Sequence, residues 1–361
     1  MRSTDGMLPS TPLRASAVVA VGTLWQGTAR AGAGPYGPLL PPNGDGLALP
    51  EGFTSRIVAR SGRKVAGLKW HAAPAGGACF PDGDGWIYVS NSKVPLLGGA
   101  SALCFGANGT VIEAYRVLPG TTLNSAGGAT PWNTWLSCEE TENGRVFECD
   151  PYGERAARPR LAMGRFRHEA VACDPERQVV YLTEDEPDGC FYRFRPRDWA
   201  DLTEGALEVL TTGGAWRPVP HPAAPVEPTR FQVPDALRFD GAGGCHYADG
   251  ICSFTTRGDG RVWSYSAGTG RLETVRDVDH LSGSGRRFVA QDGGTMEISV
   301  ITRAGEVAPF ARLEGHGHSE PAGPAFSPDG TRLYFSSQRG RTGARAGTDG
   351  HTFEVTGPFR A

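Results

Sequence analysis

FPDGDGWIYVSNS, at residues 80–92, is the stretch that decides the fold. It begins with a turn rich in Pro, Asp and Gly, continues with an apolar run that holds an aromatic residue, and ends on small hydroxyl and polar residues. Close copies are DPERQVVYLTED at 174–185 and FSPDGTRLYFSSQ at 326–338. Weaker copies are TPWNTWLSCEE (130–140), YADGICSFTTRGDG (247–260) and RRFVAQDGG (286–294). The chain therefore repeats one structural unit.

The spacing of the copies identifies that unit. The residues that align in the apolar run are Tyr88, Trp135, Tyr181, Ser253, Phe288 and Tyr334. Their successive separations are 47, 46, 72, 35 and 46 residues, so three steps agree, one carries an insertion and one is short. A unit of about 40 to 50 residues with several short strands is typical of a propeller blade. A plain β-sandwich would not require the repeat, so we predict an all-β fold: a β-propeller of six irregular blades.

The composition agrees with a turn-rich β fold and narrows the partners. The 361 residues include 51 Gly and 28 Pro, which is abundant turn material. The net charge of −3 argues against nucleic acid or an anionic membrane as the main partner. No apolar run is long enough to span a bilayer as a transmembrane segment. A closed ring is one domain, and we assign it to residues 53–361.

The N-terminal residues resemble a processed export segment. Residues 15–25 are a short apolar core, and Ala29-Arg30-Ala31 gives an A-x-A cleavage pattern. We predict a signal peptide over residues 1–31, a linker over 32–52, and a protein exported to the periplasm or beyond the cell. The alternative is a disordered, Ala-rich N-terminus in a cytoplasmic protein.

Eight cysteines are scattered along the chain, and none forms the C-x-x-C pair that would indicate a zinc knuckle. An even number in an exported protein permits disulfides, but several of these cysteines lie inside apolar strand runs. We expect buried free thiols that act as small hydrophobic side chains.

Acidic residues recur at the polar end of the repeat. The equivalent pairs are Asn91-Ser92, Cys138-Glu139, Glu184-Asp185, Thr256-Arg257, Gln291-Asp292 and Ser337-Gln338. Side chains alternate along a strand, so one residue of each pair can face the channel. Glu139, Glu140, Glu184, Asp185 and Asp292 would then gather at one end, where Ca²⁺ or an iron would relieve their repulsion. A ring of solvated acids at a channel mouth is the equally weighted alternative.

The stretch MGRFRHEA, at 163–170, is the second candidate for chemistry. It places Arg165, Arg167, His168 and Glu169 before the strand that ends at Glu184-Asp185. Arginine suits bidentate phosphate contact, and a neighbouring His and Glu can ligate metal or move protons. A charged blade loop is the alternative, but the repeat directs this stretch toward the same channel.

Longer motifs resemble those of the PhoX-type alkaline phosphatases, and more closely the shorter bacterial homologues of that family. They are AGGATPWNTWLSCEE (126–140), GRVFECDPYG (144–153), MGRFRHEAVACDP (163–175), VVYLTEDEPDGCFYRFRP (179–196), EPAGPAFSPDGTRLYFSSQRG (320–340) and TFEVTGPF (352–359). The resemblance extends from about residue 49 to 359. It implies an exported propeller that carries an iron and calcium cluster in its channel and hydrolyses phosphate monoesters.

The resemblance also implies site residues. Glu169 in the His-Glu-Ala motif and Asp185 in the Thr-Glu-Asp motif match metal ligands. Three further acids, matched less closely, are Glu139, Glu140 and Glu320. Bound cations suit phosphoryl transfer because they screen the oxyanion charge and activate an oxygen nucleophile.

The catalytic candidates are Arg165, which would grip the phosphate, and His168. Asp292 is added to the metal candidates from the repeat.

Departures from the family pattern bear on the metal. Ser125 stands where the family carries a cysteine, and a hydroxyl is a far weaker iron ligand than a thiolate. Gly243 stands where relatives carry a glutamate, and the segment LSGSGRRFVAQDGG (281–294) is shorter than usual. The N-terminus also lacks a paired Arg-Arg, which argues against twin-arginine export. We therefore expect calcium rather than iron, in a weakened or altered site.

Together these features predict an exported, metal-dependent phosphatase that acts on small phosphate esters. Two alternatives stay open: a calcium-binding propeller without catalysis that serves as a binding module, and a calcium-dependent hydrolase of lactones or esters.

Overall fold

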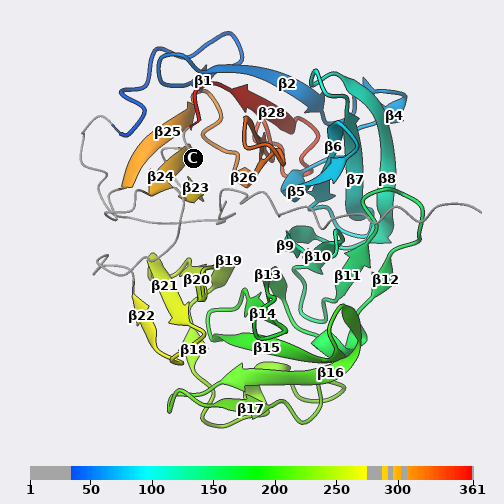
Figure 1. Cartoon of the computed structure of the whole chain (residues 1–361), viewed down its shortest axis with the longest axis vertical. Helices are drawn as coiled ribbons and strands as arrows, with labels where there is room; N and C mark the ends of the chain where they lie inside the picture. The colour runs from blue at the N-terminus through cyan, green and yellow to red at the C-terminus, as the bar shows by residue number, and fades with distance from the viewer. Residues whose placement is uncertain (1–33, 275–286, 292–295, 302–306, 360–361) are drawn as a thin grey trace, which may run out of the picture.

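The described strands form six sheets around a central axis, which confirms the predicted six-bladed β-propeller (Figure 1). The computed structural model describes residues 34–274, 287–291, 296–301 and 307–359. In these ranges the helical elements are two short 3-10 turns, η1 (Leu161–Met163) and η2 (Thr229–Phe231). Neither approaches the length and apolarity that a membrane-crossing helix needs.

The first four blades follow the chain in order. Blade 1 holds β5 (Pro74–Asp82), β6 (Gly85–Ser92), β7 (Gly98–Phe105) and β8 (Val111–Thr121). Blade 2 holds β9 (Asn124–Ala129), β10 (Trp135–Glu139), β11 (Val146–Cys149) and β12 (Arg158–Pro159). Blade 3 holds β13 (His168–Asp174), β14 (Val179–Glu184), β15 (Gly189–Asp198), β16 (Asp201–Leu210), β17 (Trp216–Pro218) and, beside β15, β18 (Arg238–Phe239). Blade 4 holds β19 (Ala242–Ala248), β20 (Ile251–Thr256), β21 (Arg261–Ser266) and β22 (Leu272–Thr274).

Strands from the N-terminal part of the chain complete the last two blades. Blade 5 joins β23 (Arg287–Gln291), β24 (Glu297–Ile301) and β25 (Val307–Leu313) to β1 (Leu47–Ala48). Blade 6 joins β26 (Pro321–Phe326), β27 (Arg332–Ser337) and β28 (His351–Thr356) to β2 (Thr54–Arg60). A small hairpin, β3 (Lys64–Val65) with β4 (Leu68–Lys69), follows β2. β1 and β2 close the ring, because the sheets of blades 5 and 6 each combine a strand from the N-terminal part of the chain with strands from the C-terminal part.

The segment expected to be a linker is part of the ring. Leu47 of β1 pairs with Leu313 of β25 and is 1% exposed. Directly after this segment, Arg56 of β2 forms an ion pair with the buried Glu354 of β28, at 2.8 Å. The Pro- and Gly-rich composition of this segment suggested a spacer, but its apolar residues lie in the core.

The repeat marks the second strand of the blades, with one exception. Tyr88, Trp135, Tyr181, Ser253 and Tyr334 lie on β6, β10, β14, β20 and β27. Phe288 instead lies on β23, the first strand of blade 5, so the copy at 286–294 was aligned to the wrong strand. The second strand of that blade, β24, carries EISVI and has no aromatic residue.

Aromatic side chains pack between neighbouring blades. Tyr88 of blade 1 stacks on Tyr334 of blade 6 with ring centroids 5.0 Å apart. Phe191 of blade 3 stacks on Phe254 of blade 4 at 4.5 Å. The eight cysteines are free and six of them are buried, which confirms the expectation of thiols in the core.

Candidate metal centre

Bulges in the innermost strands shape one end of the channel. The first strands of neighbouring blades contact one another around the axis (Figure 1). The register shifts near the start of β5, β13, β19 and β26. A β-bulge inserts an extra residue and redirects side chains, and it is common next to functional sites. Glu169 lies inside the bulge of β13, between His168 and Val171.

Backbone hydrogen bonds between loops hold the other acidic side chains at this end. Glu140 N–H donates to Leu123 O, and Asp185 N–H donates to Arg167 O, both at 3.0 Å. Gly241 N–H donates to Glu186 O and Arg257 N–H donates to Gly241 O, both at 2.9 Å. The first two bonds fix the loops after β10 and β14, and the bond from Gly241 to Glu186 ties blade 4 to blade 3 at the channel mouth.

Three carboxylates meet there. Glu140, Glu169 and Asp185 each offer one oxygen, and the three oxygens lie within 4.8 Å of one another. Their residues are only 6 to 8% exposed. We call these three residues the carboxylate cluster. Such a group of buried like charges is costly unless cations or protons compensate for it.

Two basic side chains compensate in part. Lys93 Nζ lies 2.6 Å from Glu140 Oε2, and Arg257 forms an ion pair with Asp185. Burial alone would raise the pKa of Glu140, but the charge of Lys93 lowers it to about 2. Burial likewise works to lower the pKa of Lys93, but the charges of Glu140, Glu320 and Glu169 raise it above its usual value. Lys93 and Glu140 are thus held as an ion pair.

Of the three acids in the cluster, Glu169 is the one without a basic partner at hydrogen-bonding distance among the described residues. Its Oε1 accepts a hydrogen bond from Ser125 Oγ at 3.2 Å, while its Oε2 is buried without a donor among the described residues. Burial, and then the charge of Glu140, raise the pKa of Glu169 to about 8. The cluster therefore has room for one more positive charge, next to Glu169.

The donor set indicates which metal would fit. In the part of the chain that the structure describes, the cluster consists of carboxylates, with the Ser125 hydroxyl beside them. Hard oxygen donors suit Ca²⁺ or Mg²⁺, whereas iron clusters favour thiolate or imidazole ligands. The buried Oε2 of Glu169, which accepts no hydrogen bond from the described residues, could be a ligand of such a cation, so the residues present fit a hard cation.

The other predicted acids lie outside the cluster. Glu139 is buried, but its two oxygens accept hydrogen bonds from Thr122 N–H and from Arg145, each at 3.1 Å. Glu320 lies 3.5 Å from Arg339 and is near enough to Lys93 to raise its pKa. Asp292 falls outside the described residues. Glu139 thus fixes the turn after β10, while Glu320 borders the site on the Lys93 side.

The two predicted catalytic residues are also not in the cluster. Arg165 has its guanidinium against Asn143 O, at 3.0 Å from Nη2. His168 is fully buried, with its ring 3.7 Å from that of Phe166 and its Nε2 3.1 Å from Gly164 O. Burial lowers the pKa of His168 to about 3, so the imidazole is neutral. His168 therefore supports the strand that carries Glu169.

Sequence reasoning missed Lys93 and Arg257. Arg257 stands at one of the equivalent repeat positions, and Lys93 directly follows another, so the same alignment contained the signal. Only the acidic residues at these positions were predicted to form the site, because carboxylates indicated a metal and basic residues did not.

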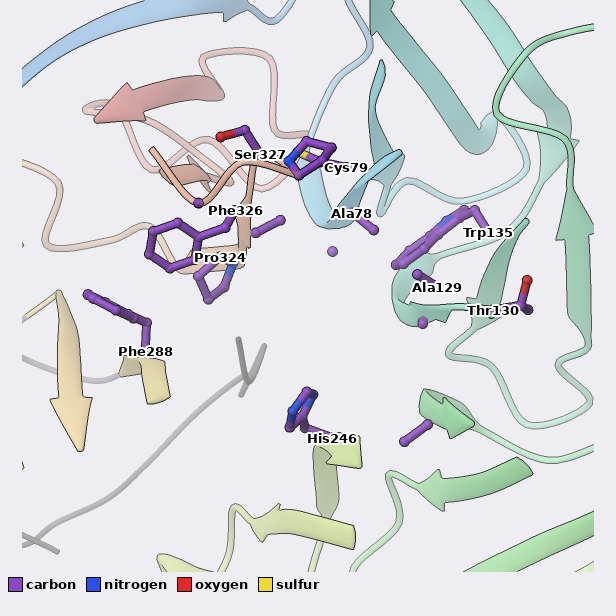
Figure 2. Close-up of a pocket in the computed structure, with 18 of the residues that line it drawn as sticks. Ala78, Cys79, Ala129, Thr130, Trp135, His246, Phe288, Pro324, Phe326 and Ser327 are labelled. Atoms are coloured by element: carbon purple, nitrogen blue, oxygen red, sulfur yellow. The ribbon is translucent and has the colours of Figure 1, made fainter. Parts of the chain in front are cut away.

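A separate cavity of about 1040 Å³ lies further along the same innermost strands. Figure 2 shows Trp135, His246, Phe288 and Phe326 around it. Glycines shape its wall: a Cβ at Gly127 or Gly128 would lie only 2.0 to 2.2 Å from a backbone oxygen. None of the cluster residues lines this cavity, so the carboxylates and the cavity occupy different parts of the channel.

Comparisons with known proteins agree with this architecture. Residues 106–219 match the family model of alkaline phosphatase PhoX, a range that includes the whole carboxylate cluster but not Lys93 or Arg257. No curated protein matches the sequence.

Solved structures share the fold. Pseudomonas fluorescens PhoX in complex with vanadate, a transition state analogue, superposes with a TM-score of 0.68 and 15% identity, covering 95% of this chain and 97% of that one. XC5397 from Xanthomonas campestris, a gluconolactonase, superposes with a TM-score of 0.53 and 12% identity, covering 90% and 99%. Residues 106–219 therefore resemble alkaline phosphatase PhoX in sequence, and the chain as a whole shares its propeller fold with the solved PhoX structure.

Proposed function

We propose that this protein is a metal-dependent hydrolase of phosphate esters, with Glu140, Glu169 and Asp185 as ligands of a hard cation. The observation that carries the proposal is the convergence of three buried carboxylates with Lys93 and Arg257 at one mouth of the channel. An acidic cluster alone would repel a phosphate. The two basic side chains give the mouth groups that attract one.

The bound cation, Arg257 and Lys93 would each contact the phosphate in a different way. The cation, when bound, supplies positive charge that stabilises the phosphoryl oxygens in the transition state. Arg257 presents a planar guanidinium fork, which matches two phosphate oxygens at once, while Lys93 acts as a point charge. Both have carboxylate partners that hold them in place before substrate arrives, which lowers the cost of ordering them.

Arg165 and His168 enter the proposal in different ways. Arg165 lies on the loop before Glu169 and can contact substrate at the rim, because among the described residues its guanidinium bonds only to the backbone carbonyl of Asn143. His168 positions the bulge of β13 from beneath. A rim contact would raise KM when Arg165 is replaced, whereas loss of His168 would lower stability and kcat together.

The test is hydrolysis of p-nitrophenyl phosphate by the purified protein with added Ca²⁺. Activity should disappear with a chelator, return with Ca²⁺, and fall by roughly 100-fold or more in kcat/KM in Glu169→Gln, which keeps the shape but removes the ligand charge. Glu142→Gln is the matched control, since Glu142 is exposed on the same loop as Glu140. Full activity in Glu169→Gln, or in chelator, would contradict the proposal.

A second candidate follows from the pairing of the basic residues. Lys93 and Arg257 already neutralise two of the three carboxylates, so a cation at Glu169 can serve binding without turnover, or activate the carbonyl of a lactone or ester. Calcium bound without any hydrolysis favours a binding module. Hydrolysis of lactones but not of phosphate esters favours the other alternative.

We further propose that the protein is exported, with residues 1–31 removed as a signal peptide and the propeller, which includes β1 as well as residues 53–361, forming its single domain. Fractionation of the producing cells, followed by N-terminal sequencing, tests this. A chain that retains its first 31 residues in the cytoplasm would contradict it.

A further inference from the structure

The loop that follows Lys93 carries apolar side chains into solvent. Three consecutive residues of this loop are exposed, and we call them the apolar lip: Pro95, Leu96 and Leu97. Leu96 and Leu97 are 77% and 76% exposed. Single exposed leucines are ordinary on protein surfaces, but two in succession beside a polar site are not explained by packing.

The lip is held in one conformation. Lys93 N–H donates to Ala73 O and Leu123 N–H donates to Val94 O, both at 2.9 Å. Leu96 adopts a φ of +59°, a value that bulky L residues rarely take. Such backbone strain tends to persist where the surrounding structure enforces it, often at binding sites. The two bonds fix the residues before the lip, and β7 begins at Gly98 directly after it, so the loop displays the two leucines between fixed ends.

The lip adjoins the carboxylate cluster. Lys93 pairs with Glu140, and Leu96 follows Lys93 by three residues, so their Cα atoms are at most about 10 Å apart. A ligand whose anionic group meets Lys93 thus has an apolar surface within reach of its other end. The lip is only a few side chains wide, far less than the roughly 800 Å² that each partner contributes to a stable protein interface.

We propose that the apolar lip receives the hydrocarbon part of an amphipathic phosphate ester, so that the preferred substrates are phosphates of medium-length alkyl alcohols. This inference rests on the proposed phosphate-ester hydrolysis and adds the nature of the leaving group. The phosphate is held by Lys93 and Arg257, and the alkyl chain leaves water by lying on Leu96 and Leu97. Each methylene so buried strengthens binding by up to roughly fourfold.

Binding of non-hydrolysable alkylphosphonates tests the inference without requiring turnover. Affinities of methyl-, butyl- and octylphosphonate for the full chain, with Ca²⁺ present, are measured by calorimetry. The wild type should bind octylphosphonate at least ten times more tightly than methylphosphonate. The double variant L96S/L97S should lose most of that gain while binding methylphosphonate within twofold of wild type.

Ile112→Ser is the matched control. Ile112 is 65% exposed on β8 of the same blade, and its strand end pairs with Phe105, away from the Gly98 end where the lip lies. This variant should keep the full dependence on chain length, and circular dichroism verifies that both variants are folded.

The outcomes separate the two proposals. Methylphosphonate binding with no dependence on chain length, or a dependence that survives in L96S/L97S, overturns the lip while leaving phosphate-ester hydrolysis standing. Failure of every phosphonate to bind, including methylphosphonate, overturns the proposed function and the lip with it. A lip that binds vesicles of neutral phospholipid instead of the phosphonates would assign it to a membrane surface and overturn the inference.

Discussion

The Ser125–Glu169 contact places a single side-chain atom where it would set the metal preference of the proposed site. Ser125 Oγ lies 3.2 Å from Glu169 Oε1, at the edge of a cluster made of carboxylates. A sulfur at this point would add a soft, negatively charged ligand to a hard oxygen site. Soft ligands raise the affinity for iron or zinc much more than that for calcium.

Ser125→Cys should therefore raise the iron content of the purified protein, measured by elemental mass spectrometry. The control is Ser137→Cys, because Ser137 Oγ bonds to Asn91 and Asn124 rather than to the cluster. Equal iron in the Ser125 variant, the Ser137 variant and the wild type would mean that the rest of the site cannot hold iron.

A second residue, His71, makes stability depend on pH. It is 5% exposed, with Nδ1 3.0 Å from Ser101 Oγ. Burial, and then the charge of Arg116, lower its pKa to about 3. An unfolded chain takes up this proton near pH 6.5, so the stabilising contribution of neutral His71 is present above that pH and is lost as the pH falls toward 3.

We expect the free energy of unfolding to drop by about 2 to 3 kcal/mol from this residue between pH 6.5 and 4.5. Urea denaturation at several pH values should show a shallower slope in His71→Gln. His221→Gln, at an exposed position, should keep the slope of the wild type. Parallel slopes in the wild type and the His71 variant would exclude this residue as a cause.

Among the elements, the two-residue strand β1 should contribute more to the stability of the fold than its length suggests. Leu47 is buried in a core that includes Phe310, Leu333 and Phe353, so it connects blades 5 and 6. Leu47→Ala should lower the free energy of unfolding by about 2 to 4 kcal/mol, since it leaves a cavity in that core. Leu40→Ala, at a side chain that is 48% exposed, should cost less than about 1 kcal/mol. Thermal or urea denaturation measures both, and equal small losses would mean that β1 is peripheral.

Elements also show where sequence reasoning stops. Second strands were found because each combines a tight turn with an apolar aromatic run, and both are local features. Phe288 was placed on the wrong strand because RFVAQ on β23 has that same local character, and only pairing with β24 distinguishes it. Residues 32–52 were interpreted as a linker because turn residues outnumber apolar ones, although Leu47 and Leu49 are in the core.

The whole molecule explains which part of the site was predictable. The sequence could predict that three acids lie close together, because equivalent positions of the blades converge at one end of the channel. These acids are Glu140, Glu169 and Asp185. The sequence cannot show that the oxygens of Glu139 are taken by Thr122 and Arg145, or that Lys93 reaches Glu140 from another blade. Those pairings depend on how the loops lie across the channel mouth.

The closure of the ring by β1 and β2 also fixes the order in which the molecule can be completed. Arg56 and its partner Glu354 are separated by 298 residues. During translation, the strands that leave the ribosome first must wait for blades that are made last. Until then β1 and β2 lack the strands that they pair with, and their edges remain open to other chains. We therefore expect this protein to finish folding slowly and to associate wherever it is made quickly.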